Sequence, residues 1–286
     1  MRERGRPGPK TAPTETTPQT APQTAALAGL RVLVTRPGAA GESLARRIEQ
    51  HGGEAVLFPV IDIEPPADET RLRNALRDLA DADRAAVDLA IFVSVHAAHA
   101  VATRLKALGL DIPATTQVAA VGPKTAAACA AAGIRVDAGP AARIDSEGLL
   151  DALRAVDLTG KRALIFRGQA GREALARGLR ARGASVRHVA AYRRRITARP
   201  VAPLVERWRG GGIDAALVSS AAVWDALLEL LGGVPGGRDL PAATPVFAYS
   251  RRVAAHCRAR GATTVTAAAQ PLDESAVDAL IAWARA

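Results

Sequence analysis

Short apolar runs alternate with amphipathic stretches along the chain from residue 30 onward. Residues 30–35 form a β-branched apolar run, which is typical of a buried parallel strand. Residues 43–51 carry apolar side chains at helical spacing, and Gly52 ends this predicted helix. Residues 55–58 are apolar again. The pattern therefore predicts a strand–helix–strand unit.

The same alternation continues to the C-terminus. The apolar runs predict strands at residues 89–93, 117–121, 134–136, 163–166, 186–190, 214–218 and 246–248. Helical spacing predicts helices at residues 70–79, 94–108, 123–132, 147–154, 169–182, 205–208, 220–231, 250–260 and 273–286. Ser146 and Asp273 are predicted to cap two of these helices. Residues 232–241 are predicted to be a loop. Two segments without helical spacing, 59–66 and 192–200, are predicted to be extended.

Three segments of the chain occur twice. The matches pair residues 32–52 with 163–183, 93–94 with 218–219, and 118–133 with 246–261, at shifts of about 131, 125 and 128. Arg36 meets Arg167 in the first of these pairs, and Leu33 meets Leu164. A chain that repeats itself in this way predicts two similar domains with a ligand site between them.

The extended segments give two ways to divide the chain. If the chain crosses between domains at both of them, residues 28–62 plus 196–286 form one domain and residues 66–190 the other. Sequential packing with a boundary near residue 157 is the alternative, and the repeats alone leave it open. Residues 1–27 are predicted to be a disordered tail. Either division predicts the α/β class, with parallel sheets covered by helices on both faces.

The composition favours an anionic partner. The 286 residues carry a formal net charge of +10, which suits phosphates, nucleic acid or a carboxylate-rich small molecule. Cys129 and Cys257 form neither a disulfide framework nor a zinc site, and we interpret them as small buried side chains. The sequence lacks a long apolar run and a signal-peptide core. We therefore expect a cytoplasmic protein without a membrane partner.

Polar turns follow six of the predicted strands. Each turn offers the free N–H groups of a helix N-terminus, and most add a hydroxyl or a cation, which is an arrangement that binds anions. For any single serine or threonine, a helix-capping role is the alternative. Together the six turns predict a site for a ligand with many carboxylates or phosphates. The residues are Arg36, Ser94, Gly122, Lys124, Thr125, Arg167, Gly168, Ser219, Ser220, Ser250 and Arg251.

Other signals are weaker. The glycines near residues 38 and 168 fall short of a dinucleotide fingerprint, so we expect no nucleotide cofactor. His96 and His99 lie three residues apart but lack a third ligand, and we interpret them as packing or solvated residues rather than a metal site. The run at 193–195 is interpreted as a solvated charged face.

The chain resembles the uroporphyrinogen-III synthase family from residue 30 to residue 286. The residues that carry the resemblance are Val-Leu-Val-Thr-Arg-Pro-Gly at 32–38, Phe-Pro-Val-Ile-Asp-Ile at 58–63, Ile-Phe-Val-Ser at 91–94, Ala-Val-Gly-Pro-Lys-Thr-Ala at 120–126, Leu-Ile-Phe-Arg-Gly at 164–168, Ala-Tyr-Arg-Arg at 191–194 and Val-Ser-Ser at 218–220. The resemblance implies two flavodoxin-like domains joined by a two-stranded ladder. It also implies cyclisation of the linear tetrapyrrole hydroxymethylbilane, with loss of water and inversion of the last pyrrole ring, without a cofactor or metal.

The resemblance also implies roles for individual residues. Tyr192 matches the functional tyrosine of the family and would assist departure of the substrate hydroxyl, although a packing role in the hinge is the alternative. The polar turns would hold the carboxylate arms of the substrate. We expect a monomer that does not bind nucleic acid, with the preceding pathway enzyme as a further partner. A hinged binding or sensor protein for an anionic small molecule, without catalysis, is the alternative to an enzyme.

Overall fold

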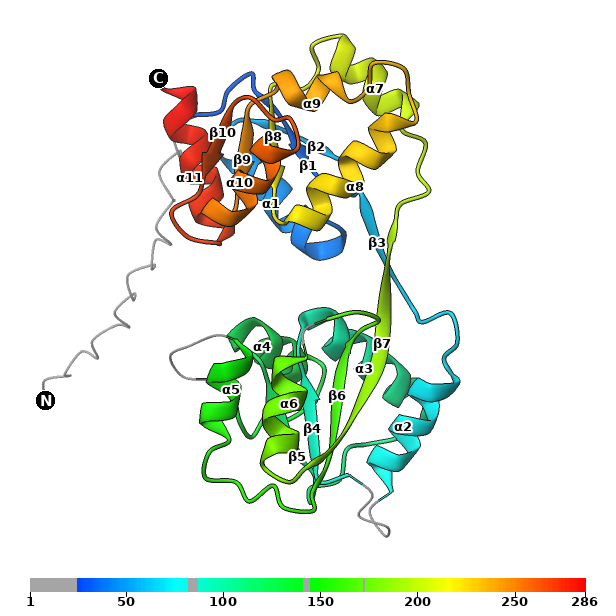
Figure 1. Ribbon diagram of the computed structural model, residues 1–286. Helices are drawn as coiled ribbons and strands as arrows, with labels where there is room; N and C mark the ends of the chain where they lie inside the picture. Colours follow the sequence, from blue (N-terminus) through cyan, green and yellow to red (C-terminus); the bar gives the residue numbers. More distant parts are fainter. Residues whose placement is uncertain (1–24, 82–86, 141–144, 172) are drawn as a thin grey trace, which may run out of the picture.

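The computed structural model describes residues 25–81, 87–140, 145–171 and 173–286. Its strands form two five-stranded sheets, and helices cover both faces of each sheet (Figure 1). A two-stranded ladder connects the two halves along one side (Figure 1). The architecture is the two-domain α/β fold that the sequence predicts. In the described ranges, every helix is too short or too polar to cross a membrane.

All strands of the first domain run parallel. Their order is β10-β9-β8-β1-β2, which is the flavodoxin-like order 2-1-3-4-5 when the strands are counted along the chain. The strands are β1 (Arg31–Val34), β2 (Glu54–Leu57), β8 (Ala215–Val218), β9 (Val246–Ala248) and β10 (Val265–Ala267). The helices are α1 (Gly38–Gln50), α7 (Ala202–Arg209), α8 (Ala221–Gly232), α9 (Asp239–Ala243), α10 (Arg251–Ala259) and α11 (Asp273–Ala284).

Successive side chains of β1 enter two different cores. Val32 and Val34 pack with residues of α1 and α11 on one face of the sheet. Leu33 packs on the other face with residues of α7, α8 and α10. All three side chains are fully buried. Because helices cover both faces, the strand is apolar throughout instead of alternating with polar residues.

The second domain is built in the same way. Its sheet has the order β3-β7-β6-β4-β5, and its strands are parallel apart from β3. The strands are β3 (Ile61–Glu64), β4 (Leu89–Phe92), β5 (Gln117–Ala120), β6 (Arg162–Gly168) and β7 (Ser185–Ile196). The helices are α2 (Thr70–Ala80), α3 (Val95–Leu108), α4 (Pro123–Ala131), α5 (Ser146–Ala152) and α6 (Ala174–Ala181).

The ladder consists of β3 and the last four residues of β7. These strands pair antiparallel, from Ile61 opposite Ile196 to Glu64 opposite Arg193. The preceding part of β7, from Ser185 to Tyr192, pairs with β6 inside the second domain, so one continuous 12-residue strand leaves that sheet and runs toward the first domain (Figure 1). The two extended segments predicted from the sequence therefore lie side by side.

The predicted strand at residues 134–136 is wrong. The sheet edge beyond β5 is instead a single bridge between Ala119 and Ala138. The carboxylate of Asp137 accepts a hydrogen bond from the N–H of Val118 at 2.8 Å, and the N–H of Asp137 bonds back to the carbonyl of Val118. These two hydrogen bonds attach the chain to the sheet edge at Asp137, after the predicted strand, and the contact with β5 is a single bridge.

Several predicted element boundaries also need correction. Asp145, not Ser146, caps α5 by accepting the N–H of Gly148 at 2.9 Å. Asp273 does not cap α11, because its carboxylate accepts the hydroxyl of Tyr249 at 2.7 Å instead. Residues 167 and 168 end β6 and are not a turn. The predicted loop at 232–241 contains the start of α9, and β10 was missed.

The folded part of the chain begins earlier than predicted. Most of the predicted tail, residues 1–24, lies outside the described residues. Leu27, at the end of that predicted tail, is fully buried in the core beneath α1 and α11. Its N–H also donates to the carbonyl of His51. The segment before β1 is therefore part of the first domain.

We predict that Leu27→Ala destabilises the protein by about 2–5 kcal/mol, the usual cost of emptying a buried leucine site. The matched control is Leu272→Ala, because Leu272 is 36% exposed and its truncation should change stability by about 0.5 kcal/mol or less. Thermal and chemical unfolding of both variants measures the difference. Equal stability of the two variants would show that Leu27 is not a core residue.

Candidate active site

A cavity of about 460 Å³ lies between the two domains, and we call it the cleft. The carboxyl ends of strands in the first domain form one wall. Residues at the N-termini of α3 and α4 in the second domain, together with the ladder, complete it. The polar residues that line the cleft are Arg36, His96, Lys124, Arg194, Ser219, Ser220, Tyr249, Ser250, Arg252 and Asp273.

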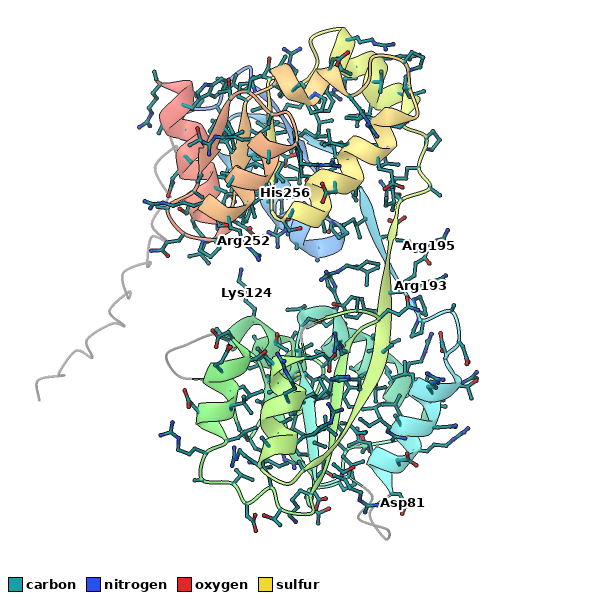
Figure 2. The ribbon with its side chains drawn as sticks, in the orientation of Figure 1. Asp81, Lys124, Arg193, Arg195, Arg252 and His256 are labelled. Atoms are coloured by element: carbon teal, nitrogen blue, oxygen red, sulfur yellow. The ribbon has the colours of Figure 1, made fainter. Side chains whose placement is uncertain are left out.

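The lining of the cleft is predominantly cationic. It contains four basic side chains from both domains and the ladder, Arg36, Lys124, Arg194 and Arg252, against the single carboxylate of Asp273. Lys124 and Arg252 point from opposite domains into the space between them (Figure 2). A cavity with this balance of charge attracts anions with several carboxylates or phosphates.

Arg36 belongs to a compact network at the end of β1. Its guanidinium forms an ion pair with Asp273 and lies 5.4 Å from the ring centroid of Tyr249. Burial and the hydrogen bond to Asp273 raise the pKa of Tyr249 far above its usual value. The Tyr249 phenol therefore stays protonated and gives its hydrogen to Asp273. The network fixes the position of Arg36 at the cleft wall.

Two helix N-termini in the first domain open on the cleft. Ser220 caps α8 and Ser250 caps α10, and each hydroxyl oxygen accepts the N–H three residues later at 3.3 Å. A capping hydroxyl that accepts in this way keeps its own hydrogen for another partner. Ser219 also lines the cleft. The helix-capping role and an anion-binding role are therefore compatible at these turns.

Tyr192 lies in β7 with only 5% of its side chain exposed. Its hydroxyl oxygen is 3.3 Å from the hydroxyl of Ser94 and 3.5 Å from a guanidinium nitrogen of Arg194. Ser94 accepts the N–H of Ala97 as the cap of α3, so its hydrogen is available to Tyr192. Arg194 can only donate. With both neighbours donating to the phenol oxygen, the phenol hydrogen is available to a ligand.

An irregularity in strand pairing brings Tyr192 to this place. The register between β6 and β7 shifts at residues 167 and 168, so that Gly168 faces Tyr192. A β-carbon on Gly168 would lie only 3.0 Å from the Cζ atom of Tyr192. The phenol ring therefore packs directly on the glycine backbone, where another residue would displace it.

Arg167, Gly168 and Ser94 belong to a second cavity of about 410 Å³, which we call the tyrosine cavity because Tyr192 lines it. The Arg167 side chain is buried, and its guanidinium donates to Glu173 at 2.9 Å and lies 3.4 Å from Nε2 of His188. Contact with this guanidinium lowers the pKa of Glu173. The protein therefore holds the Arg167 guanidinium in place through Glu173.

Three predicted site residues do not line either cavity. Gly122 caps α4 with φ 147°, a conformation that favours glycine, and borders a different pocket beside β5. Thr125 is 7% exposed in the first turn of α4. Arg251 is exposed outside the cleft lining, whereas its neighbour Arg252 lines it. The rotation of α10 after Ser250 directs Arg252, and not Arg251, toward the cleft.

Sequence reasoning missed Arg194, Arg252 and His96 as site residues. The edge of the His96 ring meets the Tyr192 ring, with 5.4 Å between centroids. Burial lowers the pKa of His96, and the nearby charges of Arg194, His99 and Arg36 lower it further. Strand alternation was the available signal for Arg194, since residues 192 and 194 share one face of an extended segment.

The cysteines are placed as expected. Cys129 and Cys257 are both fully buried, and burial raises their pKa values to about 11 and about 12. Neither thiol is therefore a nucleophile near neutral pH. Within the part of the chain that the structure describes, no three His, Cys, Asp or Glu side chains converge on a point that a metal ion would occupy.

Comparison with known proteins identifies the family. The model of the family "Uroporphyrinogen-III synthase HemD" matches residues 42–278. The chain belongs to the uroporphyrinogen-III synthase family. It is 32% identical over 202 residues to the uroporphyrinogen-III synthase of Salmonella typhimurium, covering 70% of this chain and 80% of that protein. It is 31% identical over 202 residues to the enzyme of Escherichia coli, covering 71% and 80%. The chain is thus a cyclising lyase of haem biosynthesis.

Solved structures support the fold. The chain is similar to a mutant uroporphyrinogen III synthase from Thermus thermophilus, with a TM-score of 0.57 and 24% identity over 90% of this chain and 100% of that one. It is also similar to uroporphyrinogen-III synthetase from Helicobacter pylori, with a TM-score of 0.55 and 12% identity over 89% and 99%. At these identities the likeness establishes the two-domain α/β fold.

We predict that His96→Gln weakens the dependence of stability on pH. The folded-state pKa of His96 is lowered, so the unfolded chain binds more protons as pH falls through about 6.5, and stability is lost. The variant lacks this contribution, and its melting temperature should fall less between pH 7 and pH 5 than that of the parent protein. Burial also lowers the pKa of His188, so His188→Gln is the comparison variant and should weaken the pH dependence of stability in the same direction. A parent-like pH dependence in His96→Gln would contradict the assignment.

Proposed function

We propose that the cleft binds hydroxymethylbilane and closes it to uroporphyrinogen III, with loss of water and inversion of the last pyrrole ring. The observation that carries this proposal is the meeting of a cationic cleft with a buried phenol whose hydrogen is available. Arg194 contacts the phenol and also lines the cleft. A ligand with many carboxylates can therefore be held in the cleft while one of its ends reaches Tyr192.

The acetate and propionate arms of the substrate suit the cleft wall. Arg36 and Lys124 supply positive charge from the two domains, and the N-termini of α8 and α10 supply hydroxyl and N–H donors at Ser219, Ser220 and Ser250. We assign Ser94, Arg167 and Gly168 to the tyrosine cavity, around the reacting end of the substrate. For Gly122, Thr125 and Arg251, substrate contact stays a prediction.

Tyr192 acts where the hydroxyl departs. The bond between the hydroxymethyl carbon and its oxygen breaks, and the electron pair leaves with the oxygen. The phenol donates its hydrogen bond or its proton to this oxygen, which departs as water. Electrons of the pyrrole nitrogen stabilise the carbon cation. The proton released when the closed macrocycle regains its pyrrole rings restores the phenol.

The larger task of the enzyme is positioning. The last pyrrole ring must attack the carbon cation to form a spiro intermediate, so that this ring is inverted, whereas an unrestrained chain closes without inversion. Donors on both sides of the cleft hold the arms at several points and make the folded geometry the populated one. The number of cations in the cleft matters for this reason more than the strength of any one contact.

Further properties complete the proposal. We place the domain boundaries at residues 28–62 plus 196–286 and at residues 66–190, with Leu27 added to the first domain. The enzyme acts as a cytoplasmic monomer and receives its unstable substrate from the preceding pathway enzyme. It requires no cofactor or metal and does not bind nucleic acid.

We predict that the parent protein converts freshly generated hydroxymethylbilane to the type III isomer. Tyr192→Phe should lower kcat by about 100-fold or more, the usual contribution of a general acid, and the product should shift toward type I. Chromatographic separation of the oxidised isomers measures both effects. A parent protein that yields only type I overturns the proposed function.

The matched control is Tyr249→Phe, which removes the same atom from the other tyrosine of the chain. The Tyr249 hydroxyl gives its hydrogen to Asp273 and is not available to the leaving group. This variant should act mainly through KM and retain most of kcat. An unchanged kcat in Tyr192→Phe would leave the proposed reaction intact but remove Tyr192 as the proton donor.

A further inference from the structure

We propose that Arg194 is a catalytic residue with two roles. It donates to the phenol oxygen of Tyr192, and it binds a carboxylate arm of the terminal pyrrole ring, the ring that carries the departing hydroxyl. This inference rests on the proposed function and names a contact within the same site. Four features of the structure support it.

The first feature is the direction of the side chain. The ladder turns Arg193 and Arg195 to its outer side, away from the space between the domains (Figure 2). Arg193 forms an ion pair with Glu64 at 2.8 Å, and Arg195 lies 3.9 Å from the same carboxylate. Arg194 alternates to the opposite face and lines the cleft. The three consecutive arginines are therefore not one solvated face.

The second feature is the set of partners. Arg36 is neutralised by Asp273 and Arg167 by Glu173. Within the described ranges, Arg194 forms no ion pair with an acidic side chain, and its hydrogen-bond and ring contacts are with Tyr192. A guanidinium has five N–H donors in a fixed fork that matches a carboxylate. Arg194 can therefore contact the phenol and still offer donors to a substrate arm.

The third feature is its place between the two cavities. Arg194 lines both the cleft and the tyrosine cavity. Its Nη2 atom is 3.5 Å from the Tyr192 oxygen, and its central carbon is 5.8 Å from the ring centroid. An arm bound there belongs to the ring whose hydroxymethyl group meets Tyr192. The same positive charge stabilises the negative charge that develops on the phenol oxygen as its proton moves.

The fourth feature comes from the internal repeat. A shift of about 131 positions places Ile61 on Tyr192 and Ile63 on Arg194. Ile63 is also the residue directly opposite Arg194 in the ladder. Strand β3 thus carries two isoleucines at the positions where strand β7 carries the phenol and the guanidinium. Only β7 has the side chains for the chemistry.

The experiment compares Arg194→Gln, Arg194→Lys and Arg195→Gln in the full-length protein. Arg194→Gln loses both roles, so kcat should fall and KM should rise, each by about tenfold or more, with a larger share of type I product. Arg194→Lys keeps the positive charge near the phenol oxygen but loses the fork that matches a carboxylate, so kcat should recover in part while KM stays raised. Arg195→Gln, on the outer face, should match the parent protein within about twofold.

Arg194 is exposed, so its variants should melt at the parental temperature. If the parent protein forms type III and Arg194→Gln matches Arg195→Gln in kcat, KM and isomer ratio, the role of Arg194 is overturned and the proposed function stands. If Arg194→Lys recovers KM but not kcat, the role of its charge at the phenol oxygen is overturned and only the arm-binding role survives. A parent protein that forms no type III isomer overturns both proposals.

Discussion

The antiparallel pairing of β3 with β7 is the contact on which the rest of the structure depends. Four residue pairs, from Ile61 with Ile196 to Glu64 with Arg193, hold together the two strands that pass between the domains. Because both crossings occur in one ladder, the carboxyl ends of strands from both sheets border a common cleft. The same ladder strand carries Tyr192 and Arg194. The connection between the domains and the proposed reactive end of the site are therefore one element.

The internal repeat explains how one scaffold provides an asymmetric site. Four strands of each sheet are equivalent and occur in the same order, β9-β8-β1-β2 in the first domain and β5-β4-β6-β7 in the second. Polar residues at the strand ends recur with this symmetry and suit a ligand with repeated carboxylate arms. The chemistry does not recur, because Ile61 and Ile63 stand where Tyr192 and Arg194 are placed in the other copy. In the proposed mechanism, binding therefore uses both copies of the repeat, whereas the reaction uses one.

The sequence was sufficient for the fold class and most elements, because strands buried on both faces are continuous apolar runs and glycines end the helices. It failed where a long-range polar contact decides the structure. Asp273 accepts a hydrogen bond from Tyr249 instead of capping its helix. Asp137 accepts one from Val118, next to the residues that were predicted to form a strand. His96 was interpreted as a packing or solvated residue because the residue it contacts, Tyr192, lies about 96 positions away in the chain. Arg194 was interpreted as part of a solvated charged run because strand alternation within the run was not considered.

Backbone amide hydrogen exchange with and without bound uroporphyrinogen III tests the central claim, a single site shared by both domains, most directly. The account predicts slower exchange on binding in three places at once: the starts of α8 and α10 in the first domain, the starts of α3 and α4 in the second, and the distal half of β7. Protection confined to one domain, with the ladder unchanged, would contradict it.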